Sequence, residues 1–201
     1  VERLCDIFLE LQDKCANNIN LVTATHFVPQ VAEALVKAKN KGLVIPVVYN
    51  SSAYENVSTL KILDGLVDVY LPDMKYIDSR LSAEYSKAPD YADVAKAAIQ
   101  EMVRQTGKPE FFTDDDELVK SESVEAGIMK KGVIVRHLVL PGTTKDSKAV
   151  IKYLLDTYAD EIYISIMSQY TPFERLKKHP LLSRKVTRKE YDSVVDYAID
   201  C

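Results

Sequence analysis

Two different hydrophobic periods alternate along the chain. At its start, apolar residues recur every three or four positions, at Val1, Leu4, Phe8, Leu11 and Cys15, which is the pattern of one buried helix face. The same spacing, with helix start and stop signals, predicts more helices. They are expected over residues 29–40, 58–63, 90–106 and 146–158, and a last helix begins at the capping box TRKE (187–190).

Between these helices lie short runs rich in Val, Ile and Leu. The five runs are INLVT (19–23), LVIPVVY (43–49), LVDVYL (66–71), GVIVRHLVLPG (132–142) and EIYISIM (161–167). Strands of this kind that alternate with amphipathic helices predict an α/β fold, with a parallel sheet covered by helices. Pro46 conflicts mildly with the second run, because proline is excluded from central ladder positions unless a strand starts there.

Length and composition restrict the protein class further. The chain of 201 residues fits a single domain, residues 1–201, and its formal net charge of −4 leaves no basic stripe for nucleic acid. No apolar run approaches the roughly 20 residues of a membrane span. The three cysteines Cys5, Cys15 and Cys201 form neither a disulfide framework nor a metal-ligand cluster, so we expect a cytoplasmic protein in which Cys5 and Cys15 are packed thiols.

The run GVIVRHLVLPG contains one discordant feature. Arg136 and His137 are adjacent inside an otherwise apolar strand. Because side chains alternate along a strand, the two must point to opposite faces of the sheet. If both faces are covered, at least one of them needs a buried anion or acceptor as its partner.

Polar residues follow every predicted strand. In parallel sheets and barrels, ligands bind at the carboxyl ends of the strands, so these residues are the candidate site. They are Thr23, Thr25 and His26, then Asn50 and Ser51, then Asp73 and Lys75, then Arg136 beside His137, and finally Gln169 and Tyr170.

Each candidate also has a structural interpretation. Asp73 and Lys75 can be a solvated ion pair, Arg136 can pair with Asp73 to join adjacent strands, and His26 can cap a helix. We expect His179 to be an inert loop residue and the acidic run DDDE (114–117) to be a solvated turn. No glycine-rich phosphate motif and no GxSxG nucleophile turn is present.

Five segments together carry a family resemblance. INLVTATHFVPQV, IPVVYNSSAYE, VDVYLPDMKY, VIVRHLVLPG and YISIMSQYTP resemble, in order and over nearly the whole chain, successive segments of radical S-adenosylmethionine (SAM) proteins similar to pyruvate formate-lyase-activating enzyme. The resemblance implies a partial (β/α)6 parallel barrel with SAM across the strand ends. It also implies a 4Fe–4S cluster that cleaves SAM reductively to a 5′-deoxyadenosyl radical, which in activases abstracts hydrogen from a glycyl residue of a partner enzyme.

The resemblance assigns roles to several strand-end residues. DMK matches the Asp-Leu-Lys of the activases, so Asp73 and Lys75 would contact SAM or a cation beside it. Arg136 matches an arginine near the methionyl group, which makes the SAM carboxylate its expected partner. His137 would then face the helices or a neighbouring strand.

Other positions depart from the pattern of the activases. Asn50 and Ser51 stand where the activases have the first residues of Asp-Thr-Asn-Gly, so the carboxylate is lost there. Gln169 and Tyr170 replace Tyr-His. The residues Thr23 to His26 replace the Gly-Gly-Glu-Pro segment that meets the SAM amino group, and Thr23, Thr25 and His26 offer hydroxyls and an imidazole instead.

The CxxxCxxC motif that holds the cluster in this family is missing. Cys5 and Cys15, ten residues apart on a predicted helix, cannot replace it. We therefore expect an N-terminally truncated core without its first strand, inactive by itself, whose complete protein binds SAM and the 4Fe–4S cluster. A glycyl-radical enzyme and a flavodoxin- or ferredoxin-type electron donor would be its partners, and the open barrel edge would let the fragment self-associate.

Two other functions fit the same residues. Lys75 beside Asp73 at a strand end can form a Schiff base with a carbonyl substrate, as in an aldolase-like lyase. Alternatively, the chain is a non-catalytic module that binds a nucleoside or a protein through the same strand ends.

Overall fold

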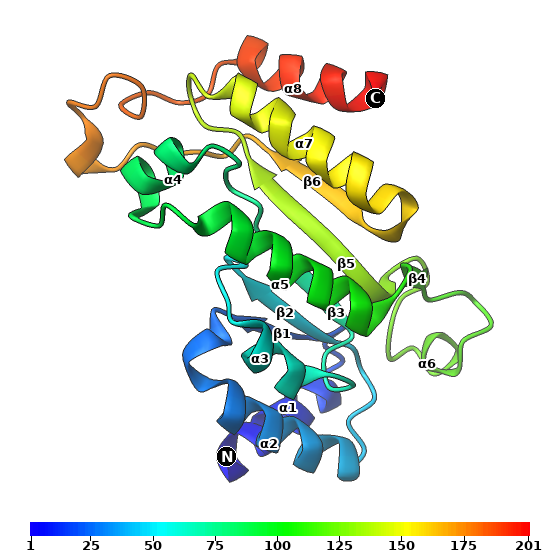
Figure 1. Cartoon of the computed structure of the whole chain (residues 1–201). Coiled ribbons are helices and arrows are strands. Elements are labelled where there is room, and N and C mark those ends of the chain that lie inside the picture. The colour runs from blue at the N-terminus through cyan, green and yellow to red at the C-terminus, as the bar shows by residue number, and fades with distance from the viewer.

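The computed structural model describes residues 1–201, and it has the mixed α/β architecture that the sequence predicts (Figure 1). Helices and strands alternate along most of the chain. The helices are α1 (Glu2–Asp13), α2 (Val28–Asn40), α3 (Val57–Leu60), α4 (Ser79–Ser86), α5 (Tyr91–Thr106), α6 (Glu117–Lys120), α7 (Thr144–Tyr158) and α8 (Arg188–Asp200). The strands are β1 (Ile19–Val22), β2 (Val47–Ser51), β3 (Val69–Pro72), β4 (Glu110–Phe111), β5 (Met129–Leu138) and β6 (Tyr163–Met167).

Five of the strands form a parallel sheet in the order β1-β2-β3-β5-β6. The two-residue β4 pairs antiparallel with the start of β5. β1 pairs with β2 and β6 pairs with β5, so these two strands are the edges of an open sheet. The parallel arrangement is therefore confirmed.

Helices cover one face of this sheet (Figure 1). On that face Val133 and Val135 of β5 are fully buried in the main core with residues of α5 such as Ala95 and Ile99. Helix α8 packs on α7 and extends the cover to β6 through Val194. The helix cover that the sequence predicts is therefore present, on this face alone.

The opposite face, here called the open face, carries no helix (Figure 1). Alternation along the strands places Val48 and Val69 on this face with Asn50 and Leu71; the two valines are buried, whereas many of the other side chains are partly or largely solvent-exposed. Val22 on β1 is 64% exposed and Tyr163 on β6 is 50% exposed, although both lie in apolar runs. Parallel registers bring Asn50 of β2 beside Leu71 of β3, and Arg136 of β5 beside Ser165 of β6, on this face.

Local details correct or confirm particular expectations. β2 begins at Val47, directly after Pro46, so the proline does not interrupt the ladder. Helix α8 has the predicted capping box between Thr187 and Glu190. Cys5 is buried as expected, but Cys15 is exposed with a φ of 58°, because α1 ends at Asp13 and the chain turns away from the core there. No helix combines the length and apolar character needed to cross a membrane.

Candidate functional site

A cavity of about 250 Å³ opens at the carboxyl ends of β3, β5 and β6. Charged groups form one part of its wall and apolar side chains form the other. The lining residues are Asp73, Lys75, Tyr76, Arg136, Leu138, Leu140, Met167 and Gln169. Four of the strand-end residues singled out in the sequence, Asp73, Lys75, Arg136 and Gln169, therefore lie around one space.

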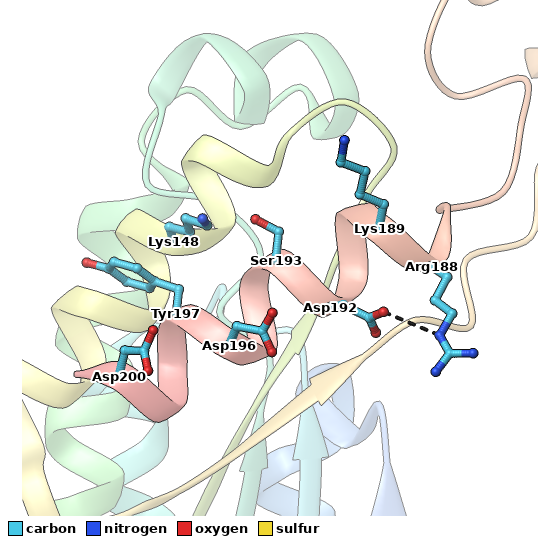
Figure 2. Close-up of a pocket in the computed structure, with 8 residues that line it drawn as sticks. All are labelled: Lys148, Arg188, Lys189, Asp192, Ser193, Asp196, Tyr197 and Asp200. Atoms are coloured by element: carbon cyan, nitrogen blue, oxygen red, sulfur yellow. Dashed lines mark hydrogen bonds and ion pairs between the residues drawn. The ribbon is translucent and has the colours of Figure 1, made fainter.

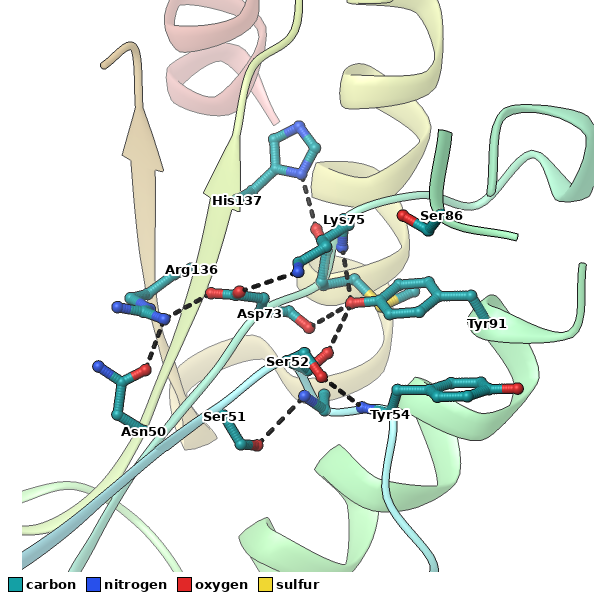
Figure 3. Close-up of polar contacts among 12 residues, drawn as sticks. Asn50, Ser51, Ser52, Tyr54, Asp73, Lys75, Ser86, Tyr91, Arg136 and His137 are labelled. Atoms are coloured by element: carbon teal, nitrogen blue, oxygen red, sulfur yellow. Dashed lines mark hydrogen bonds and ion pairs between the residues drawn. The ribbon is translucent and has the colours of Figure 1, made fainter. Parts of the chain in front are cut away.

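Arg136 is the centre of the polar wall (Figure 3). Its Nη2 donates to the Asp73 carboxylate at 2.7 Å and to the Asn50 side-chain oxygen at 2.7 Å. Lys75 Nζ lies 3.6 Å from the other oxygen of Asp73. Within the chain, the partner of the buried cation is thus Asp73, helped by Asn50, which agrees with the structural interpretation of this arginine.

Arg136 has further donors that no group of the chain uses. Its Nε is buried and has no hydrogen-bond partner. A buried donor of this kind costs free energy unless an acceptor meets it. Its Nη1 also has no partner and is not buried, so the guanidinium can hold a further acceptor there, beside Asp73.

His137 points away from Arg136, as strand alternation predicts (Figure 3). Its ring is 1% exposed, and its Nδ1 lies 2.7 Å from the carbonyl oxygen of Met74. Burial lowers the pKa of His137, so the ring is neutral near pH 7.

Tyr91 of α5 reaches the ends of two strands. Its hydroxyl lies 2.8 Å from the carbonyl oxygen of Asp73 and 2.9 Å from that of Ser52, and it accepts from the backbone N–H of Lys75 at 3.1 Å. Burial raises the pKa of Tyr91, which keeps this hydroxyl protonated. The sequence reasoning missed Tyr91 because it searched strand ends, and this residue comes from a helix.

The residues after β1 form a separate cluster. Thr25 Oγ1 donates to the Glu55 carboxylate at 2.9 Å, and the hydroxyl of Tyr49 lies 3.0 Å from the same group. Glu55 is only 4% exposed, although nothing in its sequence pattern distinguished it. Thr23, with a φ of 56°, and His26 are both exposed nearby. None of these residues lines the cavity.

Two other predicted site residues point elsewhere. Ser51 is buried, and its hydroxyl accepts from the backbone N–H of Ala53 at 3.2 Å. Because it follows Asn50 directly in β2, its side chain lies on the helix-covered face. Tyr170 is buried and donates to the carbonyl of Leu182 at 2.8 Å, whereas the neighbouring Gln169 lines the cavity.

A larger hollow, of about 640 Å³, lies along α8 beside Lys148 of α7 (Figure 2). Its walls are mostly exposed charged side chains that point away from one another, such as Lys189 and Asp196, and Arg188 forms an ion pair with Asp192 on its own helix. No buried polar group points into it. The cavity at the strand ends is therefore the candidate site.

The chain offers no ligand set for a metal. No group of three or more His, Cys, Asp or Glu side chains is arranged to hold a metal ion. Cys5 is buried in α1, whereas Cys15 and Cys201 are exposed, and all three are free thiols. The donor set that a 4Fe–4S cluster needs is thus not among these residues.

Comparisons with known proteins support the fold. No family model matches the chain. Over 154 residues, 77% of the chain, it is 29% identical to an uncharacterized protein of Methanocaldococcus jannaschii, of which the match covers 38%. The crystal structure of a domain of pyruvate-formate lyase-activating enzyme from Bacteroides vulgatus aligns with a TM-score of 0.54, over 91% of this chain and 92% of that domain, at 10% identity. The chain therefore shares the α/β fold of that domain, and it spans about two fifths of its relative from M. jannaschii.

Proposed function

We propose that the chain is the SAM-binding core of a radical SAM protein, built as a partial (β/α)6 barrel. The observation that carries the proposal is the half-buried Arg136 beside Asp73, whose Nη1 has no partner within the chain. The two residues lie at the strand ends of a fold shared with an activating-enzyme domain. A guanidinium and a carboxylate side by side match the two charges of an amino-acid head group. The methionyl part of SAM carries both charges.

The cavity suits such a head group chemically. The Nη1 of Arg136, which no group of the chain uses, would donate to the methionyl carboxylate, and Asp73 would accept from the ammonium group. Leu138, Leu140 and Met167 would contact the aliphatic part, since they form the apolar wall of the cavity. Lys75 stays paired with Asp73 at the rim.

The chemistry of the family comes from a reduced 4Fe–4S cluster, which cleaves SAM to a 5′-deoxyadenosyl radical. The residues of this chain do not fit that cluster. The role we assign to the chain itself is to bind and orient SAM. A glycyl-radical enzyme as partner, and a flavodoxin- or ferredoxin-type electron donor, belong to the same proposal for a complete protein.

Schiff-base chemistry at Lys75 is a weaker candidate. A lysine nucleophile is activated by an apolar surrounding or by a neighbouring cation. The side chain of Lys75 is 39% exposed, and its Nζ lies 3.6 Å from the Asp73 carboxylate. Borohydride trapping with a panel of aldehydes tests this chemistry directly. A stable adduct on Lys75 would favour the lyase.

Equilibrium dialysis with radiolabelled SAM tests the main proposal. We expect saturable binding that Arg136→Gln weakens about tenfold or more, the value of one charge-assisted hydrogen bond. Arg188→Gln, a change at an arginine that is 92% exposed, should leave the dissociation constant unchanged. S-adenosylhomocysteine should compete well, whereas adenosine, which lacks the carboxylate, should compete poorly. Absence of SAM binding, or equal binding by both variants, would contradict the proposal.

A further inference from the structure

The segment Asp73–Lys75 carries two charged side chains to the cavity from a stretch beyond the end of β3. Two of its backbone groups continue the ladder, since Asp73 N–H donates to Ser51 O and Met74 N–H donates to Arg136 O. Three other backbone groups of the segment, Asp73 O, Met74 O and Lys75 N–H, are held by side chains. These are supplied by His137 of β5 and Tyr91 of α5.

His137 makes one specific bond. A carbonyl oxygen only accepts, so the contact of 2.7 Å to Met74 O requires the proton on Nδ1. In the neutral ring Nε2 then carries a lone pair, and this atom is buried without a partner. An apolar side chain would avoid that unpaired atom, so packing alone does not explain a histidine here. What the ring adds is the bond to Met74.

Tyr91 holds the peptide groups on either side of Met74. Its hydroxyl lies within hydrogen-bond distance of Asp73 O and Lys75 N, and also of Ser52 O at the end of β2. The ring itself is fixed between aromatic neighbours, stacked on Tyr54 and edge-on to Tyr76. Through its hydroxyl oxygen, Tyr91 thereby links the ends of β2 and β3.

We propose that His137 and Tyr91 are positioning residues. They fix the peptide groups of Asp73–Lys75 and so set the direction in which the Asp73 carboxylate enters the cavity and meets Arg136. Arg136 and His137 are neighbours on β5 and contact this segment from opposite faces of the sheet. Arg136 binds the Asp73 side chain, and His137 binds the backbone carbonyl of Met74. The effect on a bound ligand rests on the proposed function, whereas the effect on Asp73 and Arg136 does not.

Three substitutions at His137 separate positioning from packing. The side-chain amide of asparagine carries its N–H near the place of the imidazole Nδ1, so His137→Asn can restore the bond to Met74 O. His137→Gln places its N–H near Nε2 instead, and His137→Leu has no donor. Tyr91→Phe removes one hydroxyl with little change in shape, and Tyr158→Phe is the control at a buried tyrosine of α7 away from the cavity.

Nitrogen NMR gives a readout that does not depend on any ligand. In the wild type we expect His137 to be protonated at Nδ1 and not at Nε2, and the Arg136 Nη2–H resonance to report the hydrogen bond from this nitrogen to Asp73. His137→Leu, His137→Gln and Tyr91→Phe should shift that resonance, whereas His137→Asn and Tyr158→Phe should retain it. Urea unfolding of each variant checks that all are folded.

SAM dialysis on the same variants completes the test. We expect the variants that shift the Arg136 resonance to bind SAM about tenfold more weakly, by loss of about one hydrogen bond, and His137→Asn to restore most of the affinity. An Nε2–H tautomer, or an Arg136 resonance that no variant moves, overturns the positioning role. If the resonance behaves as expected but the wild type binds no SAM, positioning stands and the proposed function fails.

Discussion

The ion pair between Arg136 and Asp73 allows a quantitative prediction about stability. The two side chains are 26% and 20% exposed, and Nη2 lies 2.7 Å from Oδ1. At an effective dielectric constant of about 20, charges at this distance attract by about 6 kcal/mol, and desolvation of both groups offsets most of that attraction. The remaining contribution should resemble that of a charge-assisted hydrogen bond, about 2 kcal/mol.

Asp73→Ala and Arg136→Met should lower the free energy of unfolding by different amounts. Asp73→Ala leaves the half-buried guanidinium with only the Asn50 oxygen, so we expect a loss of about 2 kcal/mol in the free energy of unfolding. Arg136→Met leaves Asp73 with Lys75 Nζ at 3.6 Å, which still compensates part of its charge, so we expect about 1 kcal/mol. The double variant should cost less than the sum of the two, by about 1 kcal/mol.

Urea unfolding followed by far-UV circular dichroism measures these values, since the chain has no tryptophan as a fluorescent probe. The control cycle uses Arg188 and Asp192, a pair of the same residue types on α8, whose side chains are 92% and 49% exposed. Because water screens the charges there, the losses of unfolding free energy for the two single substitutions should add up in the double variant. Additivity within about 0.4 kcal/mol at Arg136 and Asp73 as well would refute the reasoning.

Three further predictions follow from burial and exposure. Burial lowers the pKa of His137 below its ordinary value of 6.5, so only the unfolded chain takes up this proton as the pH falls below 6.5. The free energy of unfolding should therefore drop toward pH 5, by up to about 1.4 kcal/mol per pH unit from this group. Urea unfolding at pH 5, 6 and 7 measures this slope, which should be shallower for His137→Asn. An equal slope in the wild type and the variant would contradict the prediction. The exposed Val22 and Tyr163 on the two edge strands should promote self-association at high protein concentration, which Val22→Lys and Tyr163→Lys should reduce; sedimentation that is strictly monomeric for the wild type would be the opposite result. A thiol reagent should modify Cys15 and Cys201 in the folded protein but Cys5 only after unfolding, and rapid reaction of all three thiols would argue against the described packing of α1.

Much of the fold was predictable because its signals are local. Hydrophobic periods located the five parallel strands and most of the long helices, and TRKE located the start of α8. Helix α4 and the short β4 and α6 were missed, because the polar segments that contain them have no clear period. Strand alternation also separated Arg136 from His137 correctly.

The same alternation limits what the family resemblance can assign. Asn50 and Ser51 are adjacent in β2, so only one of them can face the cavity side of the sheet, and it is Asn50 that bonds with Arg136. Thr25 and Tyr170 follow strand ends too, but Glu55 and Leu182 bind their hydroxyls elsewhere. A position after a strand is therefore not sufficient for a place in this site, and Arg136 and Asn50 reach it from within β5 and β2.

The sequence by itself determined the order of strands and helices, and the strand ends at which polar residues gather. Only the tertiary structure decided which face of the sheet lacks helices, that Asp73 and Asn50 share the Nη2 of Arg136, and that Tyr91 of α5 holds the segment Asp73–Lys75. The physical reason is the range of the forces involved. Periodicity reflects the burial of neighbours along one element, whereas these contacts join residues between 16 and 86 positions apart and depend on strand register and helix packing.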